Sequence, residues 1–136
     1  MAESQEIEWH DSEICGACHV AGELHVLICA YVHKSGGKPG VDPGTGWWQA
    51  VLLTVTTDDP GQESLDELVE IAGGCVKTQS ATIEHMIPLP WMSQASTTVT
   101  LQLKDGRTWQ VSGKSASISV IGGPEYVEAF SGSNLP

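Results

Sequence analysis

The chain has 136 residues, 40% apolar and 17% charged, which is enough for one hydrophobic core without cross-links. Seventeen Asp and Glu against six Lys and Arg give a formal charge of −11. This balance argues against nucleic acids and anionic membrane surfaces as partners, because phosphate binding depends on Lys and Arg. It is compatible with a basic protein partner, which long-range attraction would draw in, and equally with acidic charge that only maintains solubility. We therefore predict a single domain over residues 1–136, as a monomer or a homodimer.

The N-terminal residues bear on the cellular compartment of the protein. The first six residues, MAESQE, lack the basic start and the apolar core of a secretory signal. No apolar run approaches the roughly 20 residues that a membrane span needs. We therefore expect a cytoplasmic protein whose four cysteines are reduced thiols, with no cofactor.

Alternation with period two dominates the first third of the chain. Apolar side chains at positions 24, 26, 28, 30 and 32 alternate with a mixed set, which predicts a long strand over Glu23–Lys34. A strand over Ser12–Val20 precedes it, joined through a turn at Ala21-Gly22. Together they predict a β-hairpin.

Residues 15–19, CGACH, match the attachment pattern of a c-type haem, and their thiols and imidazole are also zinc ligands. On a regular strand, however, Cys15 and Cys18 point to opposite faces. Cys18 is then expected on the core face, and Cys15 and His19 on the other, so neither haem nor a resident metal is predicted. A bulge at Gly16 would instead bring both thiols to one side.

A Gly- and Pro-rich loop over residues 34–46 leads to a second strong strand, Trp47–Thr57. Its two indoles point to opposite faces, so one is expected in the core. The other, beside the loop, is available to anchor a ligand or a partner.

Ser64 and Glu67 have the spacing of a capping box, and Leu65, Leu68, Val69 and Ala72 follow at helical spacing. Gly73-Gly74 would end a helix of about two turns. The segment also contains the densest acidic run of the chain, which is either a solvated face or a binding surface.

The C-terminal half predicts more strands. Ala81–Ile87 is one, and the apolar pattern around Lys104-Asp105-Gly106 favours a hairpin with a three-residue bulged loop, which pairs Leu101 with Trp109 and Val99 with Val111. Ala116–Ile121 is the next strand, and Glu125–Phe130 either pairs or forms a short helix. Residues 131–136 are expected to be disordered. The fold class predicted is all-β with one short helix, an antiparallel β-sandwich or a partly open β-barrel.

His10, Asp11 and Ser12 are the residue types of a hydrolase triad, but three consecutive side chains diverge. No catalytic residue is therefore predicted.

Three stretches, "WHDSEI" (residues 9–14), "ELHVLICAYVH" (23–33) and "WWQAVLLTV" (47–55), occur in the order found in a loose set of small bacterial β-rich proteins. In these proteins a strand opens with His-Asp-Ala/Ser-x-Ile/Val, and residues 10–14 of this chain have that pattern. The chain thus resembles this set, which includes some immunity proteins of polymorphic toxin systems. The resemblance implies a β-rich fold.

Three functional hypotheses follow. The first is a non-enzymatic binding module, immunity-like, that neutralises a basic partner such as a toxin nuclease through an acidic surface and an exposed Trp; its candidate residues are Trp47, Trp48, Asp58, Asp59, Asp66, Glu67 and Glu70. The second is a small-molecule-binding barrel or sandwich with Trp47 or Trp48 in its pocket. The third is a metal or thiol-redox protein that uses Cys15, Cys18 and His19.

Overall fold

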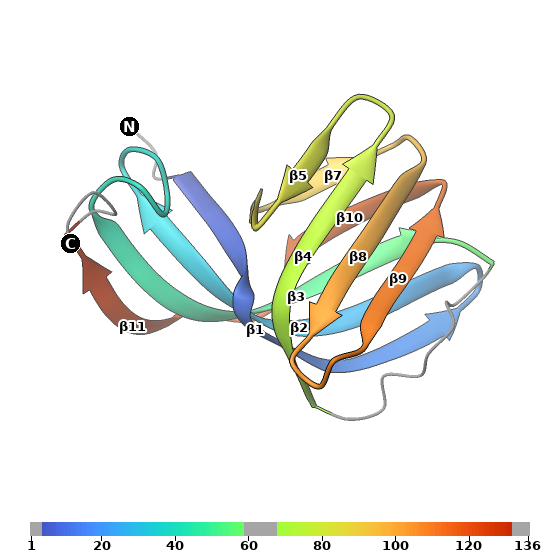
Figure 1. Ribbon diagram of the computed structural model, residues 1–136, viewed down its shortest axis with the longest axis horizontal. Coiled ribbons are helices and arrows are strands. Elements are labelled where there is room, and N and C mark those ends of the chain that lie inside the picture. The colour runs from blue at the N-terminus through green and yellow to red at the C-terminus, as the bar shows by residue number, and fades with distance from the viewer. Residues whose placement is uncertain (1–3, 59–67, 132–136) are drawn as a thin grey trace.

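The computed structural model describes residues 4–58 and 68–131, and among these residues it contains strands and no helix (Figure 1). The strands are β1 (Ser4–Val20), β2 (Glu23–Ser35), β3 (Gly44–Thr56), β4 (Val69–Thr78), β5 (Thr82–Glu84), β6 (Met86–Pro88), β7 (Trp91–Ser93), β8 (Thr97–Leu103), β9 (Thr108–Gly113), β10 (Ser115–Val120) and β11 (Glu125–Phe130). No helix within the described ranges has the length and apolar character to cross a bilayer.

All strands belong to one antiparallel sheet, which confirms the predicted all-β class. The order is β7-β10-β3-β2-β1-β4-β8-β9, with β11 paired to β3, β5 to β4 and β6 to β1. The path ends at β7 and β9, so the sheet is not closed into a barrel.

β4 folds the sheet over on itself. Val69 and Glu70 pair with β1, whereas the rest of the strand, from Ile71 to Thr78, pairs with β8. As a result β4, β8 and β9 cross in front of β1, β2 and β3 (Figure 1). One apolar core joins the two parts, from Val26 and Leu53 on one side to Leu101 and Trp109 on the other.

β1 departs from regular pairing twice. Between Glu8, opposite Tyr31, and Glu13, opposite Cys29, four residues of β1 face a single residue of β2. A second irregularity leaves Cys15 as an extra residue, because Ile14 pairs with Ile28 and the next residue but one pairs with Leu27.

The second bulge corrects the prediction for the cysteine motif. Because side chains alternate, one extra residue exchanges the faces of all residues after it. Ala17, opposite Val26, packs against the core, and Cys18, opposite His25, is exposed. The prediction that Cys18 faces the core was therefore wrong, as was the placement of His19, which lies opposite Leu24.

The predicted helix is also wrong where the structure describes it. Ser64, Leu65 and Glu67 lie outside the described residues, but Val69–Thr78 is strand β4. Val69 and Ile71 are buried while Glu70 and Ala72 are exposed, a period of two that the helical spacing of the apolar residues had concealed. β1 and β8 supply backbone partners for this strand.

The strands predicted in the C-terminal half are mostly present in the structure. Leu101 pairs with Trp109 and Val99 with Val111, and Gly106 has a φ of 94°, which confirms the bulged hairpin. Residues 125–130 form a strand, not a helix. The single strand expected over Ala81–Ile87 is divided into β5 and β6 by His85, whose φ is 67°.

The close contact between β4 and the core generates a stability prediction. A Cβ on Gly74 would lie 2.6 Å from Cγ of the fully buried Trp9, whereas a Cβ on Gly73 would meet nothing within 4 Å. We expect Gly74→Ala to lower the free energy of unfolding by about 1–3 kcal/mol through overpacking. Gly73→Ala is the matched control and should change it by less than about 0.5 kcal/mol. Urea unfolding measures both, and equal effects would contradict the packing described.

Candidate functional site

The N-terminal half of β1, the C-terminal half of β2, the start of β3 and β11 extend beyond the covered part of the sheet (Figure 1). One face of this extension carries most of its polar and aromatic side chains. Cross-strand pairing places Tyr31 of β2 opposite both Glu8 of β1 and Trp48 of β3, and Gly46 opposite both His33 and Glu128. Residues that are directly opposite share a face, so these side chains lie together.

Four rings follow one another across this face, from Trp48 through Tyr31 and His33 to Phe130; we call them the aromatic row. Their centroids are 5.3 Å apart for Trp48 and Tyr31, 5.2 Å for Tyr31 and His33, and 5.0 Å for His33 and Phe130. The last pair is stacked and the Tyr31–His33 pair is edge-on. Such packing fixes the rings relative to one another.

Two carboxylates hold the centre of the row. The Tyr31 hydroxyl donates a hydrogen bond to Glu128, and Nε2 of His33 donates to Oε1 of Glu8 at 2.7 Å. Burial raises the pKa of Tyr31, and the hydrogen bond and the negative charge of Glu128 raise it further. Tyr31 therefore remains a neutral donor at physiological pH.

Ser12 positions the neighbouring acidic groups. Its side chain is buried; Oγ accepts from the backbone N–H of Tyr31 at 2.9 Å and donates to the carbonyl oxygen of Glu8 at 2.7 Å. These bonds close the first irregularity of β1, in which Asp11 adopts a φ of 76° and is exposed. Left-handed backbone is tolerated by Asp better than by most residues.

A cavity of about 380 Å³ lies at the Trp48 end of the aromatic row; we call it the acidic–aromatic pocket. Its lining consists of Asp11, Ser12, Glu13, Tyr31, Trp48, Glu70, Lys104, Val127 and Glu128. Four of these residues are carboxylates and one is a lysine. Glu13 and Glu70 are directly opposite each other, a like-charge pair that Lys104 Nζ, 3.5 Å from Glu70 Oε2, offsets only in part. The pocket has an excess of negative charge beside two aromatic rings.

The structure brings two of the predicted partner-binding residues together. Trp48 and Glu70 both line the acidic–aromatic pocket, although they lie on different strands. Trp47 packs against the core, with its Nε1 donating to Thr45 Oγ1 at 2.7 Å. Asp58 is exposed in a different hollow, and Asp59, Asp66 and Glu67 lie outside the described residues.

Sequence reasoning missed Asp11, Glu13, Tyr31 and Glu128 as members of the pocket. The polar side of the alternating strand Glu23–Lys34 was a usable signal for Tyr31. The approach of Glu128 depends on β11 pairing with β3, which no local pattern indicates.

The thiol motif forms no common centre. Cys18 is exposed and Cys15 half-buried, both as free thiols, and Nε2 of His19 donates to the carbonyl oxygen of Thr57 at 2.7 Å. Burial raises the pKa of the Cys29 thiol, and the nearby Cys15 raises it further. A protonated thiol is a poor nucleophile, which argues against Cys29 as a redox thiol.

Within residues 4–58 and 68–131, donor atoms of three or more potential metal ligands converge at one place, Glu8, His10 and Asp11, within 4.8 Å of one another. Nδ1 of His10 is 3.1 Å from Asp11 Oδ1 and 3.7 Å from Glu8 Oε2. His10 and Asp11 are exposed. Exposed acidic groups commonly gather in this way without a metal ion.

The chain matches no protein-family model, and neither a curated protein nor a solved structure matches it.

The buried hydroxyl of Tyr31 predicts a specific loss of stability in alkali. Its pKa is raised above the ordinary value of 10.0 in the folded chain, so the unfolded chain ionises first as the pH rises above 10. The contribution of the neutral Tyr31 hydroxyl to the free energy of unfolding is present in full below pH 10 and is lost as the pH rises above that value. Urea unfolding at pH 9 and pH 11 should give a smaller loss for Tyr31→Phe than for the wild type, with Glu128→Gln between them. A loss of stability in Tyr31→Phe as large as that in the wild type would show that ionisation of Tyr31 is not its cause.

Proposed function

We propose that the protein is a non-enzymatic binding module that captures a basic protein partner in the acidic–aromatic pocket. The observation that supports this most is the grouping of four carboxylates around the adjacent rings of Tyr31 and Trp48, with Lys104 as the one basic lining residue. A cationic side chain gains from both parts of this lining: its charge pairs with a carboxylate, and an aromatic face attracts it further.

Arginine suits the pocket better than lysine. Its planar guanidinium stacks on an aromatic face and donates to carboxylates in a fixed fork. Glu13 and Glu70, held opposite each other on β1 and β4, repel in the free protein. A guanidinium between them relieves that repulsion, so the free energy gained on binding exceeds that of a single ion pair.

The hydroxyl groups of the pocket favour binding over catalysis. The Oγ of Ser12 is engaged with two backbone groups, and Tyr31 donates to Glu128 with a raised pKa. Neither is prepared to act as a nucleophile, since an active nucleophile needs an adjacent base or a lowered pKa.

An immunity-like role suits this chemistry. A nuclease needs a basic surface to bind its phosphate substrate, and an acidic protein that covers such a surface blocks the substrate. The charge of −11 would also speed association with a basic partner at low salt.

An arginine-rich probe tests the pocket directly. We expect an acetylated, amidated hexa-arginine peptide to bind with an affinity that falls as salt is added. Trp48→Ala and the double variant E13Q/E70Q should each weaken the Kd about tenfold or more, because they remove the ring or the paired charges. Isothermal titration calorimetry at fixed ionic strength measures the Kd.

The matched control is Asp58→Asn, which removes one exposed carboxylate outside the pocket. It should change the Kd by less than about twofold. Equal weakening by Asp58→Asn and E13Q/E70Q would mean that the peptide senses overall charge and not the pocket, and would contradict the proposal.

A further inference from the structure

Lys104 already supplies a cation to the acidic–aromatic pocket. Of the six Lys and Arg residues of the chain, it is the one that lines this pocket, as far as the described residues show. Its Nζ lies 3.5 Å from Oε2 of Glu70. In the free protein, the ammonium of Lys104 therefore occupies the kind of position that a guanidinium of the partner takes in the proposed complex.

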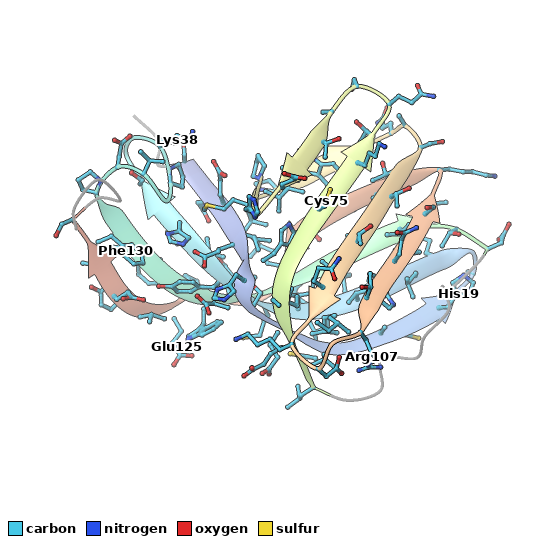
Figure 2. The ribbon with its side chains drawn as sticks, viewed as in Figure 1. His19, Lys38, Cys75, Arg107, Glu125 and Phe130 are labelled. Carbon is cyan, nitrogen blue, oxygen red and sulfur yellow. The ribbon has the colours of Figure 1, made fainter. Side chains whose placement is uncertain are left out.

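Backbone contacts fix Lys104 beside Glu70. The N–H of Lys104 donates to the carbonyl oxygen of Glu70 at 3.0 Å. Lys104 directly follows β8, at the end of the hairpin that Arg107 marks in Figure 2. Two bonds close this loop, from the N–H of Gly106 to the carbonyl oxygen of Leu103 at 3.0 Å and from the N–H of Leu103 to that of Arg107 at 2.9 Å. The main chain is thus held in place, and the side chain is the part of Lys104 that is able to move.

The ion pair between Lys104 and Glu70 is open to exchange. The two side chains are 41% and 61% exposed, and an exposed pair contributes little to stability because water screens it. The other cation of the same loop is held differently: Nε and Nη2 of Arg107 each lie 2.8 Å from Oδ2 of Asp105. Lys104 is therefore the residue of this loop whose charge reaches the pocket.

Glu13 gives Lys104 a reason to remain at Glu70 until another cation arrives. Glu13 lies directly opposite Glu70 on β1, and two like charges at such a position repel each other. If the ammonium left without a replacement, this repulsion would no longer be offset. A second cation that approaches Glu70 is in turn repelled by the ammonium, so the two compete for one carboxylate.

From these contacts we propose that Lys104 is an internal competitor of the partner: its ammonium pairs with Glu70 in the free protein and leaves when an arginine of the partner binds. The proposal rests on the function proposed above for the same pocket. It adds that the pocket is held in a partly neutralised state, which lowers its affinity for cations. Binding exchanges one cation for another at Glu70 and adds a guanidinium contact with the aromatic rings.

Removal of the ammonium tests the competition. We expect Lys104→Gln to tighten the Kd of the acetylated, amidated hexa-arginine peptide about three- to fivefold, measured by isothermal titration calorimetry at fixed ionic strength. Lys104→Arg keeps the charge and should not tighten it. The matched control is Lys114→Gln, which removes a lysine that lines a different hollow. It should change the Kd by less than about twofold.

A double-mutant cycle identifies the carboxylate through which Lys104 acts. In a Glu70→Gln background, Lys104→Gln should tighten the Kd by less than about twofold, because the pair that holds the ammonium in the pocket is already absent. In a Glu13→Gln background, the tightening should persist. A Lys104 that merely repelled the peptide from a distance would give the same tightening in both backgrounds and would contradict the exchange at Glu70.

Carbon-13 NMR of the Lys104 side chain follows its release on the unmodified protein. The Cε resonance in Glu70→Gln serves as the reference for an ammonium that is not paired with Glu70. Saturation of the wild type with the hexa-arginine peptide should move the Lys104 Cε resonance toward that reference. A resonance that stays where it is in the free protein would show that the ammonium does not leave.

The outcomes separate this proposal from the one on which it rests. If neither the wild type nor Lys104→Gln binds the peptide, both proposals are overturned. If Trp48→Ala and E13Q/E70Q weaken binding while Lys104→Gln leaves it unchanged or weaker, the pocket binds cations and the internal competitor alone is overturned. Equal tightening by Lys104→Gln and Lys114→Gln would also overturn it, because overall charge would then be the cause.

Discussion

The buried side chain of Ser12 is the constraint on which the rest of the site depends. It bonds the main chain of β1 at Glu8 and that of β2 at Tyr31, and so holds together two strands whose regular pairing is interrupted between Glu8 and Glu13. Without that interruption, β1 would continue in register along β2. With it, Asp11 turns outward and Glu13 comes opposite Glu70 of β4. One hydroxyl therefore maintains the acidic side of the pocket.

The aromatic row supplies the complementary constraint. Trp48, Tyr31, His33 and Phe130 come from three strands and pack at centroid distances near 5 Å. The two central rings are hydrogen-bonded to carboxylates: the Tyr31 hydroxyl to Glu128, and Nε2 of His33 to Glu8. The acidic–aromatic pocket lies at one end of this row, and a smaller cavity whose lining includes Asp42 and Phe130 lies at the other. Each combines an aromatic ring with at least one carboxylate, in a chain with 17 acidic and six basic residues.

Local patterns predicted some of this fold. The alternation of β2 and β3 and the bulged hairpin between β8 and β9 follow from residue periods alone, and the structure has them. Cys18 was misplaced because one inserted residue reverses every later side chain. Gly16 was the signal in the sequence for such a bulge, and the structure has the irregularity between Ile14 and Gly16. Residues 69–72 form a strand because β1 and β8 provide pairing partners, a tertiary effect that outweighs helical spacing. In the pocket, Trp48 and Glu70 were foreseeable as exposed aromatic and acidic groups. Glu128 was not, because only the pairing of β11 with β3 brings it to Tyr31.

Chemical-shift mapping with N-acetylarginine amide tests most directly the central claim, that cationic groups are recognised by the acidic–aromatic pocket. Amide and indole N–H resonances are followed as this single guanidinium is added at constant ionic strength. We expect the largest shifts at the Trp48 indole and at the amides of Ser12, Glu13 and Glu128, with little change at Asp58. Shifts centred on Asp58, or spread evenly over the acidic residues, would contradict it.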